Sequence, residues 1–266
     1  MSKIILQFDG PIARVTLNRP ELLNALDDEA CTLLLQAARK IEKTPGVRCV
    51  ILSAAGKSFM AGADVNSMNA QLSNADLDLA SEFESAVVRK ANEFCQVMER
   101  LPVPVVVSAR GYVAGGGLGL AACGDFLIVS DTAVFIAAHI QVGLSPDHGT
   151  SWYLNRLVGS RKAKEILMFG ARISAADAKQ FGLANEVVPD ADLESFTDAY
   201  ARKLVAMPAM AVANIKRLIN SAPQHSFSDH LQMEAKMLAE ASLTADYREG
   251  VRAFVEKRKP RFGQAG

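Results

Sequence analysis

Short apolar segments without polar–apolar alternation constrain this chain most. Residues 49–52 are entirely apolar, and residues 105–108 and 126–130 are nearly so. A strand that faces solvent on one side alternates, whereas a strand in a sheet covered by helices on both faces does not. Helical patterns at 27–43 and 81–100 stand between these segments. This alternation of strands and helices predicts an α/β fold.

The two ends of the chain differ from this central part. Residues 4–8 and 12–17 read as two strands around a turn, and Asp27 is expected to cap the first helix. Residues 72–80 are polar, and we expect a mobile loop there. The C-terminal part is helical in pattern. Breaks in its helices are expected at Pro208, Pro223 and Gly250. We divide the chain into a core of residues 1–195 and a helical region of residues 196–266 that joins copies of the chain.

The composition excludes several kinds of partner. Lys plus Arg and Asp plus Glu both number 29, so the net charge is zero and no nucleic-acid partner is expected. No apolar run approaches the roughly 20 residues that span a bilayer, and the N-terminus lacks the pattern of a signal peptide. The four cysteines are scattered, which favours reduced thiols over a metal site. We therefore expect a cytoplasmic protein without a metal ion or a membrane partner.

Two glycine-containing loops carry the functional signal. Residues 58–64 follow a strand, and their small side chains would let the backbone approach a ligand closely. In residues 111–122, three glycines precede a short helix of small residues. The free amides at such a helix N-terminus favour an anion or a developing negative oxygen. A tight turn capped by Asp64 is the alternative for the first loop, and close helix packing is the alternative for the second.

A series of short motifs runs in order through nearly the whole chain. They are the segments 15–20, 24–26, the two glycine loops, 142–147, 172–175, 182–183, 187–189, 246–251 and 253–258. With these motifs the chain resembles the crotonase (enoyl-CoA hydratase/isomerase) family. The resemblance implies a crotonase-like α/β fold, a spiral of repeated ββα units with a helical C-terminal appendage. It also implies a homo-oligomer, either a trimer or a dimer of trimers.

The resemblance further implies which residues hold the substrate. The backbone amides of Ala63 and Gly116 would form an oxyanion hole for the carbonyl of an acyl-CoA thioester. Two fixed donors that strengthen as charge grows on that oxygen lower the barrier selectively. Coenzyme A, as part of the substrate and with no permanently bound cofactor, would contact Arg19, Leu23, Ala25, Lys57, Ala61, Phe254 and Lys257.

The chain departs from the family pattern where a hydratase places two glutamates around a water. The matching positions are Gly119 and His139. His139 could act as an acid or base at neutral pH, or it could only line the pocket. Asp147 stands where family isomerases and related aromatic acyl-CoA enzymes keep a catalytic aspartate, and capping a helix is its alternative role. Efficient proton abstraction would require burial to raise its pKa, and the neighbouring His148 could modulate it.

A single carboxylate suits moving a proton between two carbons better than adding water. We therefore expect an enoyl-CoA isomerase with Asp147 as the base. A hydratase that uses His139 and Asp147 is the first alternative. The second is a non-catalytic acyl-CoA-binding protein that has lost its acids.

Overall fold

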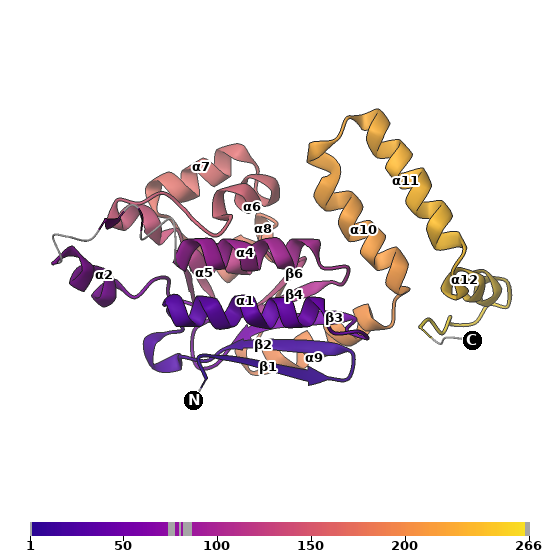
Figure 1. The fold of residues 1–266 in the computed structure, drawn as a ribbon, viewed down its shortest axis with the longest axis horizontal. Helices are drawn as coiled ribbons and strands as arrows, with labels where there is room; N and C mark the ends of the chain where they lie inside the picture. The colour runs from indigo at the N-terminus through magenta and orange to yellow at the C-terminus, as the bar shows by residue number, and fades with distance from the viewer. Residues whose placement is uncertain (1, 74–77, 80, 82–86, 264–266) are drawn as a thin grey trace.

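A six-stranded sheet forms the centre of the molecule in the computed structural model, which describes residues 2–73, 78, 79, 81 and 87–263 (Figure 1). Its strands, in spatial order, are β1 (Ile4–Asp9), β2 (Ile12–Leu17), β3 (Cys49–Ala54), β4 (Val105–Ala109), β6 (Phe126–Ser130) and β9 (Glu186–Val188). β1 and β2 pair antiparallel, and every later neighbour pairs in parallel. The five strands expected from the sequence are confirmed within two residues of their predicted ends.

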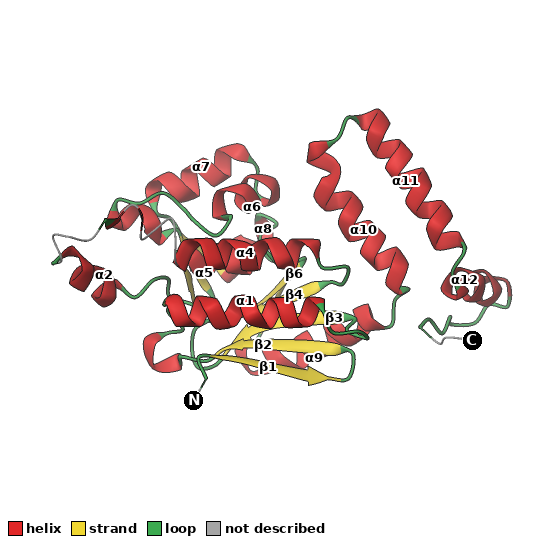
Figure 2. Cartoon of the chain, in the orientation of Figure 1, coloured by secondary structure: helices red, strands yellow, loops and turns green. Residues whose placement is uncertain are grey.

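Helices surround this sheet (Figure 2). The longer ones are α1 (Asp28–Glu42), α2 (Val65–Leu72), α4 (Val87–Arg100), α5 (Gly116–Ala122), α6 (Thr150–Leu157), α7 (Ser160–Phe169), α8 (Ala175–Gln180), α9 (Leu193–Val205), α10 (Ala209–Ser221), α11 (Phe227–Ser242) and α12 (Ala245–Val255). The predicted cap of α1 is confirmed, because the Asp27 side chain accepts a hydrogen bond from the Ala30 amide. The helix expected at 81–100 is confirmed from Val87 onward. Most of the predicted loop at 72–80 lies outside the described residues.

Both faces of the sheet are buried, as the unbroken apolar strands predict. Val50 and Leu52 of β3 face a large core that α1 and α4 cover. Cys49 and Ile51, which point the other way, join a second core that α9 covers. Because residues 49–52 of β3 are covered by helices on one side or the other, this stretch needs apolar residues throughout.

A second, smaller sheet stands beside the first. It contains β5 (Tyr112–Ala114), β7 (Val134–Ile136) and β8 (Arg172–Ser174), with β7 at its centre. β4 and β6 each give way within a few residues to a strand of this sheet, and a helix follows. The predicted ββα repeats are therefore confirmed.

The C-terminal helices leave the sheet after α9, and α10 to α12 project to one side (Figure 1). The predicted division at residue 195 falls inside α9, which packs on the sheet. Lys216 anchors the base of this arm: its Nζ lies 2.7 Å from Asp125 Oδ2 and donates to the carbonyls of Met98 and Val103. Among the described residues, no helix is both long and apolar enough to cross a membrane.

The break predicted at Gly250 is wrong, because Gly250 lies inside α12. The chain turns instead at Leu243 and Thr244, where the Thr244 side chain caps α12 by accepting a hydrogen bond from the Tyr247 amide. A single glycine costs a helix only about 1 kcal/mol, which its neighbours can offset. A capping threonine is the stronger signal.

Candidate active site

The two glycine loops lie against each other. The Met60 amide donates to Tyr112 O at 3.0 Å, and the Ala114 amide donates to Met60 O at 2.8 Å. Glycine is needed where the backbones meet: a Cβ on Gly117 would lie 2.8 Å from Met60 O, and one on Gly111 would collide with the carbonyl of Lys57. The loops are therefore one structural unit, although about 50 residues separate them in the chain.

The N-terminus of α5 opens beside this junction. Gly115 occupies the N-cap position and offers no side chain to accept from the helix amides. Every residue of α5 is buried, so no bulk water surrounds the first turn. The first amides of a helix have no intrahelical partner, and their aligned dipoles favour negative charge. The sequence expectation of a bare helix N-terminus is confirmed.

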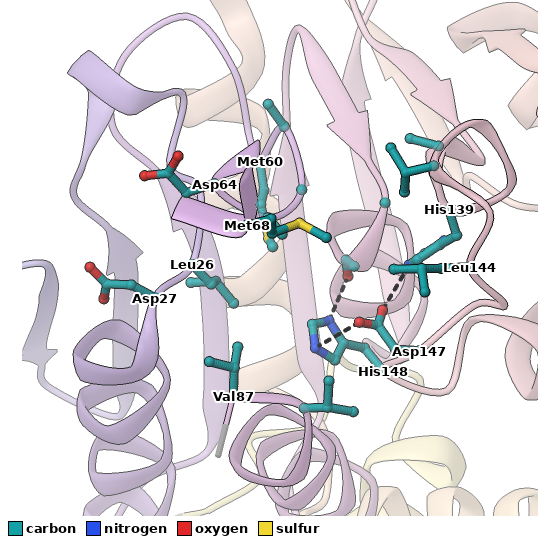
Figure 3. A pocket seen from close by; sticks show the side chains of 18 of the residues that line it. Leu26, Asp27, Met60, Asp64, Met68, Val87, His139, Leu144, Asp147 and His148 are labelled. Atoms are coloured by element: carbon teal, nitrogen blue, oxygen red, sulfur yellow. Dashed lines mark hydrogen bonds and ion pairs between the residues drawn. The ribbon is translucent and has the colours of Figure 1, made fainter. Parts of the chain in front are cut away.

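A cavity of about 380 Å³ lies between these loops and the segment that precedes α6 (Figure 3). Ala63 and Gly116 line it, together with Asp147 and His139. The structure thus brings all four predicted catalytic positions to one cavity. Much of the remaining wall is apolar and includes Leu26, Met60, Met68, Val87, Val142 and Leu144.

The carboxylate of Asp147 is held between two histidines (Figure 3). His139, from the short 3₁₀ helix η2 (Ala138–Val142), donates from Nε2 to Asp147 Oδ1 at 2.8 Å. On the other side, His148 Nε2 lies 3.5 Å from Asp147 Oδ2. The His148 side chain is 4% exposed and that of Asp147 is 28% exposed. His148 is the neighbour that sequence reasoning left with only a modulating role.

The structure overturns the alternative role of Asp147 and the expectation about its pKa. Asp147 does not cap α6: the helix begins at Thr150 after Gly149, and the carboxylate points to His139 instead. Burial does raise the pKa of Asp147, but it is outweighed by the hydrogen bond from His139 together with the positive charge that the two neighbouring imidazoles carry when protonated. The pKa of Asp147 therefore lies below its ordinary value, where we expected it to lie above.

Gly119 has no room for a side chain. A Cβ there would lie 2.5 Å from His148 O and 2.7 Å from Thr150 Oγ1. The segment that carries Asp147 and His148 occupies the space into which a longer residue at 119 would project. The neighbouring backbone therefore excludes a glutamate side chain at position 119.

The positions predicted to hold coenzyme A fall into two groups. The first lies around the first glycine loop, where Ala61 lines the cavity: Arg19 donates to Ala25 O at 2.9 Å, and the Ala61 amide donates to Leu23 O at 3.0 Å. Lys57, in the same group, is exposed next to the first glycine loop.

The second group lies at the far end of the C-terminal arm. Phe254, in α12, is 86% exposed, and Lys257 follows the same helix. Figure 1 shows α12 at the opposite end of the molecule from α2, which lines the cavity. The structure does not bring Phe254 and Lys257 to the pocket of their own chain. A role for them in binding coenzyme A would have to be exercised on another copy.

Comparison with known proteins places this architecture in a family. Residues 7–265 match the family model described as enoyl-CoA hydratase/isomerase. The chain is 35% identical to 1,2-epoxyphenylacetyl-CoA isomerase of Escherichia coli over 98% of both sequences. It is 33% identical to the short-chain-enoyl-CoA hydratase of Clostridium acetobutylicum over 97% of both. A crystal structure of an enoyl-CoA hydratase from Polaromonas superposes with a TM-score of 0.89 at 32% identity, covering 97% of this chain and 99% of the other. The chain therefore belongs to the enoyl-CoA hydratase/isomerase, or crotonase, family of enzymes.

Proposed function

We propose that this enzyme is an isomerase that moves a double bond along the acyl chain of an enoyl-CoA thioester. The observation that carries the proposal is the place of Asp147. A Cβ on Gly116 would lie 3.2 Å from Asp147 Oδ1, so the carboxylate stands beside the first amide of α5. A base that stands beside an oxyanion donor can reach a carbon next to a carbonyl bound there.

The chemistry follows from that arrangement. Asp147 removes a proton α or γ to the thioester, and the electron pair moves into an enolate. The amides of Ala63 and Gly116 hold the enolate oxygen, and their hydrogen bonds strengthen as its charge grows. The proton then returns to another carbon. Because its pKa is lowered, Asp147 is ionised at neutral pH and can accept a proton, although the same lowered pKa makes it a weaker base.

The other carboxylates of the cavity wall are less suited to this role. Asp27 caps α1 and pairs with Lys3 and Arg19. Asp28 pairs with Lys90. In Figure 3, Asp27 and Asp64 lie on the opposite wall, and their carboxylates point away from Asp147. With Asp28 paired to Lys90 and the carboxylates of Asp27 and Asp64 turned away, none of these three is placed to hold a water together with Asp147, which favours proton transfer between carbons.

A panel of 2-enoyl, 3-enoyl and aromatic CoA esters in heavy water tests the proposal. We expect the position of the double bond to shift, with deuterium incorporated and no mass gain of about 18 Da, since no water is added. A gain of about 18 Da on a 2-enoyl ester without any positional shift would establish the hydratase alternative. Tight binding of the esters without any chemical change would instead support a non-catalytic acyl-CoA-binding protein.

We also propose that copies of the chain assemble through the C-terminal arm. Large apolar side chains stand exposed along it, with exposed fractions of 68% to 86%: Ile219, Phe227, Leu238, Leu243, Phe254 and Val255. Apolar surface of this extent is typical of an interface. Light scattering after size exclusion measures the mass, for which a multiple of three chains is expected. A monomer at micromolar concentration would contradict the proposal.

A further inference from the structure

His148 is a buried group in the pocket to which the proposed reaction gives no role. Its Nδ1 lies 3.2 Å from Gly116 O. A carbonyl oxygen only accepts, so Nδ1 carries a hydrogen and donates it. Nε2 is then the other ring position, and it has no hydrogen-bond partner among the described residues. It lies 3.5 Å from Asp147 Oδ2, close to a hydrogen bond but not forming one.

The backbone of His148 has a conformation that residues other than glycine rarely adopt. His148 has φ +49°, in the left-handed region. Its carbonyl accepts from Cys95 Sγ, and Thr150 Oγ1 fixes the preceding carbonyl at 2.7 Å. Gly116 and Gly119 leave room for the ring and its backbone, since a Cβ on either would collide with His148. Strained residues that their surroundings hold in place cluster at functional sites.

The two oxygens of Asp147 have different neighbours. Oδ1 accepts from His139, and Oδ2 lies on the side of His148, so we take Oδ2 as the oxygen that receives the carbon-bound proton. A carboxylate, however, holds a proton weakly, and an imidazole nitrogen holds it more firmly. The unpartnered Nε2 of His148 faces the oxygen that receives the proton.

We propose that His148 is the proton-holding partner of Asp147: its Nε2 accepts the proton that Oδ2 removes from the acyl chain and returns it through the same oxygen. The inference rests on the proposed function. The C–H bond breaks, its electron pair becomes the enolate, and the proton passes from Oδ2 to Nε2. The imidazolium then donates to Gly116 O and to Asp147, so both of its N–H groups are paired. In reverse, the proton reaches the other carbon as the enolate electrons form the new C–H bond. Neither an oxidant nor a second reactant is needed.

The test measures exchange of the α-hydrogens of butanoyl-CoA with heavy water, which needs the base and the oxyanion hole but no double bond. His148→Gly suits the positive φ and leaves a space for a small ring. We expect its exchange rate to fall about 100-fold while KM stays within about threefold. Free imidazole should restore the rate at least about tenfold, since it can hold a proton in the empty space. Pyrazole, a ring of the same size and a much weaker base, should not.

The opposite outcomes are distinct. If His148→Gly exchanged the α-hydrogens at the wild-type rate, or if pyrazole restored the rate as well as imidazole does, His148 would only fill space. Should the glycine variant fail to fold by circular dichroism, His148→Asn serves instead, because asparagine tolerates this conformation but cannot hold the proton. A wild-type enzyme that exchanges but never shifts a double bond contradicts the proposed function and leaves His148 in its role. A wild-type enzyme that isomerises while the His148 variants keep full rate contradicts only the role of His148.

Discussion

The two walls of the pocket supply chemistry in different ways. The glycine-loop wall, which carries Ala63 and Gly116, offers backbone amides, and its side chains matter because they are small. The histidine wall, which carries His139, Asp147 and His148, offers side chains. Under the proposed function, the first wall binds the carbonyl oxygen of the thioester and the second decides which proton moves. Relatives of the chain carry the names isomerase and hydratase. Four substitutions test this division.

Asp147→Asn should have the largest effect. It keeps the shape and the bond to His139 but removes the base, so we expect kcat to fall about 1000-fold with KM nearly unchanged. Steady-state kinetics and a binding titration with the same CoA ester separate the two quantities. Asp192→Asn, on the surface near α9, is the matched control and should be fully active. Substantial turnover by Asp147→Asn would show that another group is the base.

Gly62→Val tests the glycine-loop wall. Gly62 has φ +102°, which a β-branched residue avoids, so the loop that carries Ala63 must shift. Displacing one oxyanion donor should lower kcat about 100-fold. Gly46→Val also places valine at a positive φ, but in open space and outside the pocket. That control should lose stability and keep its activity. Equal kcat values in Gly62→Val and Gly46→Val would show that the Ala63 amide does not contribute to catalysis.

His139→Leu tests how the histidine wall tunes its base. Loss of the hydrogen bond should let burial raise the pKa of Asp147 from its lowered value. A carboxylate with a lowered pKa stabilises the fold above its unfolded pKa and loses that contribution as pH falls through the folded pKa. The variant should therefore lose less stability in acid than the parent does.

We expect kcat of His139→Leu to fall about tenfold, the size of one hydrogen bond to a charged group. Carbon-13 NMR titration of the aspartate carboxyls reports the pKa directly. In His139→Gln, whose side chain can still donate a hydrogen bond, both kcat and the pKa of Asp147 should lie between those of the parent and of the leucine variant. An unchanged pKa in the leucine variant would mean that His139 does not control the carboxylate.

Cys95→Ala should have the smallest effect, because Cys95 supports the histidine wall only through a weak sulfur hydrogen bond to His148 O. We expect the free energy of unfolding to fall by about 1 kcal/mol and kcat to stay within about threefold. Cys31→Ala makes the same change in α1, where the thiol is equally buried, and should leave kcat unaltered. Denaturant titration and kinetics are the measurements. If kcat fell tenfold in Cys95→Ala but not in Cys31→Ala, Cys95 would be needed to position the histidine wall.

Sequence reasoning reached the fold and the glycine-loop wall from local patterns, and the family resemblance pointed to His139 and Asp147 of the other wall. Unbroken apolar strands, the Asp27 cap and the glycines before α5 each act over a few residues, and the structure has them where expected. The histidine wall was harder to predict. The 2.8 Å contact of His139 with Asp147, and the pKa it lowers, depend on how η2 folds back beside α6. The place of His148 depends on a positive φ and on two glycines of another helix, which no spacing in the sequence reveals.

Gly119 has a consequence for how this enzyme can evolve. Because a Cβ at this position would lie 2.5 Å from a backbone oxygen rather than from a movable side chain, no rotamer relieves the contact. Gly119→Glu alone would displace the Asp147–Thr150 backbone, and with it the existing activity, before it could position a water. A lineage that acquired a glutamate at this position would have to reshape residues 147–150 first. A working glutamate at 119 is thus a change that no single substitution supplies.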